Sequence, residues 1–199
     1  AKFVRIMSYK VLEQDDQLAD ERIRRLRLIV DSFSAEGITS VHENCMNYGG
    51  MSWKHTMELI EAVPGMKLVF DTCNPVFNRD HSQEDKPWQD AWEFYQNVKE
   101  HISYIHVKDG LNPSPENGNK EVYTYPGEGQ GCVKEIMQDL MESGYEGGIS
   151  IEPHLAAVFH DADSQNHTDE DPKDIYIRYG QKLMEILSSI GYQYSPYQI

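Results

Sequence analysis

The chain has 199 residues, of which 39% are hydrophobic, and this is enough for one globular domain with its own core. A net charge of −15 disfavours a nucleic-acid partner, because a phosphate backbone needs a basic groove. No apolar run approaches membrane-spanning length, and the first residues form a strand pattern instead of a secretion signal, so we expect no membrane partner. The three cysteines Cys45, Cys73 and Cys132 form no Cys-x-x-Cys pair, which favours a reduced, cytoplasmic setting.

Apolar strands alternate with amphipathic helices along the chain. The pattern predicts strands over residues 3–9, 39–44, 66–71, 102–108 and 148–152. It predicts helices over residues 18–33, 53–63, 87–99, 133–143 and 172–190. Ser52 is a suitable cap for the second helix, and Pro87 suits the first turn of the third. Two polar segments, 111–130 and about 156–172, are expected to be long loops, the first of them functional or mobile.

This alternation implies parallel strands joined by crossover helices. A doubly wound open sheet and a (β/α)8 barrel both fit the order. The phosphate-binding motifs GxGxxG and GxxxxGK[ST] of the open sheet are missing. The segment "PGEGQG" (126–131) is glycine-rich but lies inside a long loop, so its indication of a phosphate site is weak. Polar residues close one strand after another, and this favours the barrel.

Four predicted strands end in a side chain that can bind a metal ion: Glu43, Asp71, His106 and Glu152. In a barrel, the carboxyl ends of the strands converge on one mouth, where active sites lie. Three carboxylates and one imidazole suit Mn²⁺, Mg²⁺ or Co²⁺, with Zn²⁺ possible. A single carboxylate at a strand end is more often a turn former, so a shared metal site and separate turn residues both stay open at this point.

The alternation of side chains along a strand adds detail around these four residues. Lys108 shares a face with His106, whereas Asp109 points the other way and is expected to orient a neighbour or cap a loop. His154 shares a face with Glu152 and either supports the site or contacts the substrate. His42 lies on the opposite face from Glu43, so a structural role is favoured.

Five segments together resemble the xylose isomerase-like (β/α)8 superfamily: "VHEN", "FDTCNP", "YIHVKD", "PGEGQG" and "GYEGGISIEPH". That superfamily contains sugar isomerases and epimerases, tagatose epimerases, inosose dehydratases and apurinic endonucleases. The resemblance implies that one divalent metal ion has four ligands: Glu43, Asp71, His106 and Glu152. It also implies that Glu43 and Glu152 move protons. Three further residues would line the substrate pocket: Asn74, Lys108 and His154.

The chain departs from the family pattern in two ways. Many relatives carry histidine where this chain has Asn74, and since an amide cannot shuttle protons, Asn74 is expected to bind a hydroxyl group. The family barrel has eight strands, whereas residues 1–199 supply about five as a single domain, so about three N-terminal βα units are lacking. The open sheet edges imply a fragment of a longer protein, or strands supplied by another chain in a homo-oligomer or by a partner subunit.

The resemblance implies a metal-dependent isomerase or epimerase of a sugar or related polyol, working by proton transfer through a metal-stabilised enediolate. A leaving group on that intermediate would make the enzyme a dehydratase, or a lyase that cleaves a C-glycosidic bond in a keto-sugar. His154 and His160, which follow Glu152, keep this alternative open. A non-catalytic sugar-binding or assembly subunit is a third reading. A phosphodiesterase of the apurinic endonuclease kind is disfavoured, because such sites gather several zinc ions and more histidines.

Overall fold

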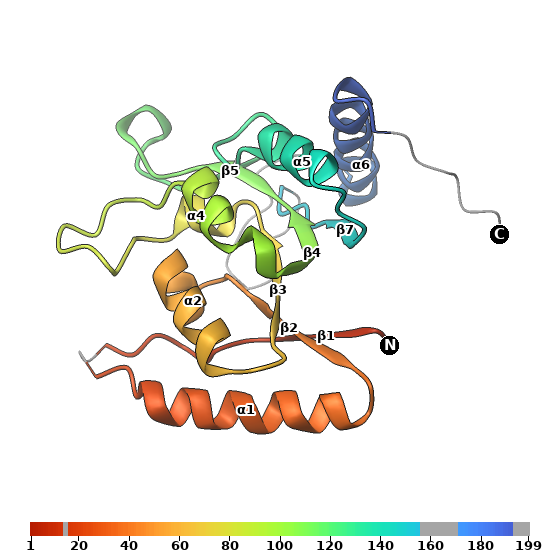
Figure 1. Cartoon of the computed structure of the whole chain (residues 1–199). Helices are drawn as coiled ribbons and strands as arrows, with labels where there is room; N and C mark the ends of the chain where they lie inside the picture. The colour runs from red at the N-terminus through yellow and green to blue at the C-terminus, as the bar shows by residue number, and fades with distance from the viewer. Residues whose placement is uncertain (14–15, 156–170, 193–199) are drawn as a thin grey trace.

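Five parallel strands form the central sheet of the protein. The computed structural model describes residues 1–13, 16–155 and 171–192 (Figure 1). In this part of the chain, the strands pair in the order β1 (Phe3–Ile6), β2 (Thr39–Glu43), β3 (Lys67–Asp71), β4 (Ile102–Val107) and β7 (Gly148–Ile151). Every neighbouring pair is parallel. The prediction of an incomplete barrel is confirmed, because these strands form a half-barrel that follows the chain order.

Helices connect the successive strands. They are α1 (Ala19–Ala35), α2 (Trp53–Ala62), α3 (Asn74–Phe77), α4 (Ala91–Val98), α5 (Val133–Glu142) and α6 (Pro172–Ser189). Short 3₁₀ turns cover Gly49–Met51 (η1), Lys99–His101 (η2) and Pro115–Asn117 (η3). Figure 1 shows α1 beside β1 and β2 at one end of the sheet and α6 at the other end. None of the helices among the described residues is long and apolar enough to cross a membrane.

Apolar side chains between the sheet and the helices hold these elements together. Phe70 and Ile105 from the strands pack with Tyr179 of α6 in the larger cluster. Val30 of α1 and Leu59 of α2 belong to a second cluster beneath β1 and β2. All five side chains are almost fully buried, and each such burial contributes roughly 1.5–3 kcal/mol to stability. The helix cap at Ser52 is confirmed, since its hydroxyl accepts the backbone N–H of His55.

Helix α4 begins later than its sequence pattern predicts. The cap is Asp90, whose side chain accepts the N–H of Glu93, so the helix starts at Ala91. Pro87 instead lies in an extended segment, where its carbonyl accepts the N–H of Asp80 at 2.8 Å. The prediction of a helix from Pro87 is therefore wrong by one turn, because this pairing holds the backbone before Asp90 extended.

The segment predicted as a loop over residues 111–130 contains regular structure. Strands β5 (Asp109–Leu111) and β6 (Val122–Thr124) pair as an antiparallel hairpin, with η3 between them. Strand β1 in turn ends at Ile6, short of the predicted residue 9, and Tyr9 adopts a left-handed φ of 67° that no strand tolerates. The loop prediction failed because both hairpin strands are too short to show a periodic pattern.

Candidate metal centre and substrate pocket

The four predicted metal ligands come together at the carboxyl end of the sheet. One ligand atom each of Glu43, Asp71, His106 and Glu152 lies within 4.8 Å of the others. Glu43 and Asp71 end β2 and β3, His106 pairs with Asp71 in the parallel register, and Glu152 follows β7 directly. Opposite ligands of an octahedral Mg²⁺ lie about 4 Å apart, so a divalent ion fits this spacing. We call these four residues the carboxylate cluster.

Two basic side chains bridge the carboxylates. Arg5 Nη1 lies 2.8 Å from Glu43 Oε2 and 3.9 Å from Glu152 Oε1. Lys108 Nζ lies 3.1 Å from Asp71 Oδ2 and 3.5 Å from Glu152 Oε2. The sequence reasoning missed Arg5, although a charged residue inside the short apolar strand β1 was the available signal. Among the described residues, three carboxylates face two permanent cations, so the cluster keeps excess negative charge that could favour a metal ion.

Burial and mutual charge shift the pKa values in the cluster. Complete burial raises the pKa of Asp71 to about 6, and Glu43 and Glu152 add to the rise against the opposing Lys108. Burial also works against ionisation of Glu43, but His106, Arg5 and Lys108 outweigh it and lower its pKa. Asp71 and Glu43 share one electrostatic environment, in which an added cation would favour the ionised form of both carboxylates.

Backbone donors and side-chain amides fix Asp71 and its neighbours. Asp71 Oδ1 accepts the N–H groups of Cys73 and Asn74 at 2.9 and 2.7 Å, which leaves Oδ2 directed at Lys108. The Asn74 amide donates to Glu43 Oε1 at 3.3 Å and accepts from Lys108 Nζ at 2.9 Å. Asn44, the residue after β2, exchanges two hydrogen bonds with the backbone of Asp71. The end of β3 is therefore held in place from both sides.

A pocket of about 440 Å³ lies over the carboxylate cluster. The three predicted substrate contacts, Asn74, Lys108 and His154, all line it. His154 is buried, and its ring centroid lies 5.1 Å from that of Tyr123. Tyr123 and Glu121 also line the pocket, and sequence reasoning missed both because the β5–β6 hairpin that carries them was expected to be a loop. His160 lies outside the described residues.

The glycine-rich segment 126–131 folds around Asp109 instead of facing the pocket. The buried Asp109 carboxylate accepts the N–H groups of Gly110, Gly127, Gly129 and Gly131 at 2.8 to 3.0 Å. A side chain at Gly129 would place its Cβ 2.3 Å from Asp109 Oδ1, so only glycine fits there. The prediction that Asp109 caps a loop is confirmed. The glycine-rich segment is therefore not a phosphate site, because the backbone N–H groups that would bind a phosphate already bind the Asp109 carboxylate.

The cysteines next to the cluster are poor nucleophiles. Burial raises the pKa of the Cys45 thiol to about 11, and Glu43 adds to the effect. Burial likewise raises the pKa of Cys73 well above its ordinary value. Both thiols therefore remain protonated near neutral pH, as expected of cysteines that pack and do not react.

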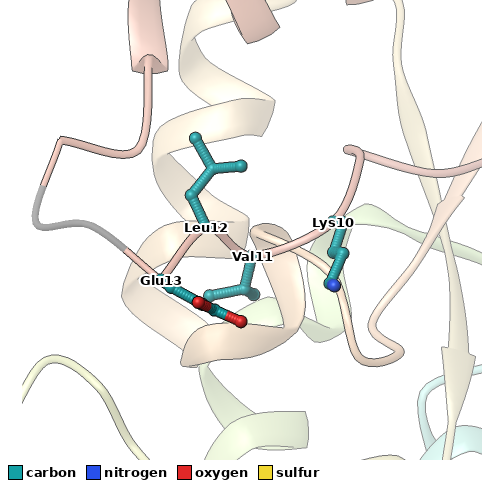
Figure 2. Close-up of a pocket in the computed structure, with 4 residues that line it drawn as sticks. All are labelled: Lys10, Val11, Leu12 and Glu13. Carbon is teal, nitrogen blue, oxygen red and sulfur yellow. The ribbon is translucent and has the colours of Figure 1, made fainter.

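A separate hollow lies at the segment Lys10, Val11, Leu12 and Glu13 (Figure 2). It is a shallow, open depression of about 470 Å³. Figure 2 shows that the lysine and glutamate side chains do not converge on a common point. The carboxylate cluster, with its convergent ligands, is the better candidate site.

Comparison with known proteins places the chain in a family. A family model described as "Xylose isomerase-like TIM barrel" matches residues 2–175. The sequence has no significant match among curated proteins. A D-tagatose 3-epimerase-like protein shares 19% identity and a TM-score of 0.68, over 96% of this chain and 63% of that chain.

Two further solved structures share the fold. A xylose isomerase-like TIM barrel protein from Mycobacterium smegmatis, in complex with magnesium, matches at 16% identity and a TM-score of 0.67, over 96% of this chain and 62% of that chain. A probable 3-DHS dehydratase from Bacillus anthracis matches at 19% identity and a TM-score of 0.57, over 76% of this chain and 57% of that chain. The chain thus spans from 57% to 63% of the length of these three proteins.

Sequence identities of 16–19% show that the fold is shared, but they do not identify the substrate. The family match extends over most of the chain, and the parallel half-barrel gathers four side chains that could hold a metal ion at the carboxyl ends of the strands, where barrel enzymes have their active sites. The chain belongs to the xylose isomerase-like TIM barrel family.

Proposed function

We propose that the protein is a divalent-metal-dependent isomerase or epimerase of a sugar or a sugar-like polyol. One observation carries this proposal: Glu43 and Glu152 reach the same centre from β2 and β7, which are separated in the sheet by β3 and β4. Two carboxylates that approach one centre from different strands can remove a proton on one side of a carbon atom and return it on the other. The epimerase-like relative is consistent with this chemistry.

The carboxylate cluster would hold the metal ion through Glu43, Asp71, His106 and Glu152. Its hard oxygen ligands and single imidazole suit Mg²⁺, Mn²⁺ or Co²⁺, with Zn²⁺ possible, and the Mycobacterium smegmatis relative was solved with magnesium. Such an ion, when bound, supplies a Lewis acid for a carbonyl oxygen and an adjacent hydroxyl oxygen.

The two glutamates differ in how firmly they are held. Glu43 is buried and bound by Arg5 at 2.8 Å, whereas the Glu152 side chain is 28% exposed, with cations at 3.5 and 3.9 Å. We assign proton removal next to the carbonyl group to Glu152, since it is freer to move. Glu43, which is ionised at rest because its pKa is lowered, would take up a proton from solvent and return it to the other side of the carbon, while Glu152 would release its proton to solvent. Asn74 would bind a substrate hydroxyl, while Lys108 and His154 would contact other oxygens of the substrate.

Solvent-deuterium exchange tests the assignment. The protein, loaded with Mg²⁺ or Mn²⁺, is expected to incorporate deuterium from solvent into a ketose at the carbon next to the carbonyl. Glu152→Gln should reduce the exchange rate by roughly 10²- to 10⁴-fold, because the amide cannot accept the proton. Glu142→Gln, which changes an exposed glutamate at the end of α5 and outside the pocket lining, is the matched control and should retain most of the rate. Exchange that persists in Glu152→Gln would remove Glu152 from this role.

A lyase outcome is the second candidate. The probable dehydratase among the relatives and the buried His154 beside Glu152 favour it, because an acid near the leaving group would turn deprotonation into elimination. Product analysis after incubation with a 3-keto glycoside separates the two reactions: an epimer supports the first, and an unsaturated or cleaved product supports a dehydratase or a C-glycoside lyase. Tight metal binding without exchange on any sugar would instead favour a binding or assembly subunit.

We further propose that additional strands complete the barrel, from the same polypeptide or from a second chain. Among the described residues, β1 and β7 each pair on one side only. Parallel strands are rarely left exposed in this way. The mass of the native particle, measured by light scattering, would distinguish a monomer from a homo-oligomer or a complex with a partner subunit.

A further inference from the structure

The carboxylate cluster presents an electrostatic problem when no metal ion is bound. The side chains of Glu43 and Asp71 are only 3% and 0% exposed. Both lie in a cluster whose ligand atoms are within 4.8 Å of one another. Buried carboxylates at this spacing repel one another strongly unless a positive charge lies among them. Something in the chain must therefore hold the site together before the metal arrives.

Lys108 is placed to supply that charge. Its side chain is 6% exposed, and its ammonium lies 3.1 Å from Asp71 Oδ2 and 3.5 Å from Glu152 Oε2. Asp71 Oδ1 is already occupied by backbone N–H groups, so Lys108 faces the oxygen that remains for a metal ion. Glu152 Oε2 also lies 3.7 Å from His106 Nδ1, on the inner side of the cluster. Lys108 thus pairs with the same oxygens that would bind the metal.

The lysine is also anchored at its backbone. Its N–H donates to Thr72 Oγ1 at 3.2 Å, and its carbonyl accepts from the same hydroxyl at 2.5 Å. Thr72 directly follows β3, so this pair of bonds links the ends of β3 and β4 beneath the cluster. Asn74 accepts a third contact from the ammonium at 2.9 Å. Arg5 differs, because its side chain is 46% exposed.

We propose that Lys108 is a positioning residue that stands in for the metal ion: it keeps the carboxylates assembled in the metal-free protein and competes with the metal for Asp71 and Glu152. The inference rests on the proposed metal binding but not on the isomerase reaction. Removal of the ammonium should have two opposite effects. The metal-free protein should lose stability, while the affinity for a divalent ion should rise, because a competing cation has been removed.

The test compares Lys108→Gln with the unchanged protein in two measurements, melting temperature without metal and Mn²⁺ affinity by titration. We expect a lower metal-free melting temperature, a larger rise on addition of Mn²⁺, and Mn²⁺ binding that is roughly tenfold or more tighter. Lys108→Arg, which retains the charge, should remain close to the unchanged protein in both measurements. Lys99→Gln is the matched control: it breaks the 3.0 Å pair with Asp139 away from the site and should leave Mn²⁺ affinity unchanged.

Unchanged or weaker Mn²⁺ binding in Lys108→Gln would overturn the inference. If Lys108→Gln does not fold without metal, the double variant Asp71→Asn/Lys108→Met is tested. Because this variant lacks both charges, its metal-free folding should be restored. Failure of the double variant to fold without metal would contradict the positioning role of Lys108. Solvent-deuterium exchange into a ketose is measured separately, in the unchanged protein, so that the isomerase proposal is tested independently of Lys108. Tighter Mn²⁺ binding in Lys108→Gln, together with no exchange in the unchanged protein, would uphold the inference and reject the isomerase proposal. Exchange in the unchanged protein, together with unaltered or weaker Mn²⁺ binding in Lys108→Gln, would uphold the isomerase proposal and reject the inference.

Discussion

Lys108 and Asp109 are consecutive, yet they belong to two buried ionic assemblies of opposite design. Lys108 enters the carboxylate cluster, where three carboxylates meet two basic side chains. Asp109 enters the glycine-rich segment 126–131, where its carboxylate accepts three backbone N–H groups of that segment as well as the N–H of Gly110. The second assembly is complete within the chain. The first retains negative charge and could therefore bind a cation, whereas the second holds a loop in place.

The first prediction separates the two assemblies by metal affinity. Asp71→Asn removes one charged ligand from the cluster and should weaken Mn²⁺ binding by at least ~100-fold, as measured by calorimetric titration. Asp109→Asn alters the neighbouring assembly and should change Mn²⁺ affinity only a few-fold. Equal losses in both variants would show that the two assemblies are not independent.

The second prediction concerns stability. Asp109→Ala leaves the N–H groups of residues 110, 127, 129 and 131 without their acceptor. Those of residues 110 and 131 are buried, and a buried unsatisfied donor is costly. The free energy of unfolding should fall by about 3 kcal/mol or more in urea denaturation of the metal-free protein. A loss below about 1 kcal/mol would mean that other contacts hold the segment.

The smallest expected effect is a pH-dependent loss of stability caused by His42. This buried side chain lies on the opposite face of β2 from Glu43, outside both ionic assemblies. Burial lowers its pKa from 6.5 to about 4, so the folded protein holds it neutral. The unfolded chain takes up a proton below pH 6.5 while the folded chain does not, so stability present above that pH is lost as the pH falls toward 4. By pH 5 the loss should reach about 2 kcal/mol.

Urea denaturation at pH 7 and pH 5 measures this loss. The comparison with His42→Gln isolates it, because glutamine does not titrate and the difference between the two proteins should shrink at the lower pH. A difference that is independent of pH would show that His42 is not held neutral.

The strand ends were predictable from sequence for a physical reason. Parallel strands place their carboxyl ends at one edge, so Glu43, Asp71, His106 and Glu152 could be assigned to one place without knowledge of the packing. Helix boundaries were less certain, and α4 shows why: the pairing of Asp80 with Pro87 overrides the local preference of proline for a first turn.

The missed residues share a different cause. Arg5 lies within a short strand, and its charge is a signal of function that does not show which residue of the neighbouring strand β2 it contacts. Glu121 and Tyr123 reach the pocket through the β5–β6 hairpin, whose strands are only three residues long each. Such contacts arise from tertiary pairing, which short-range sequence patterns do not encode.

Direct counting of bound metal tests the central claim, that the four strand ends form one divalent-metal site. Chelator-treated protein is titrated with Mn²⁺, and free Mn²⁺ is followed by electron paramagnetic resonance. The account predicts one tightly bound ion per chain, lost in Asp71→Asn. Absence of tight binding, or tight binding that survives Asp71→Asn unchanged, would contradict it.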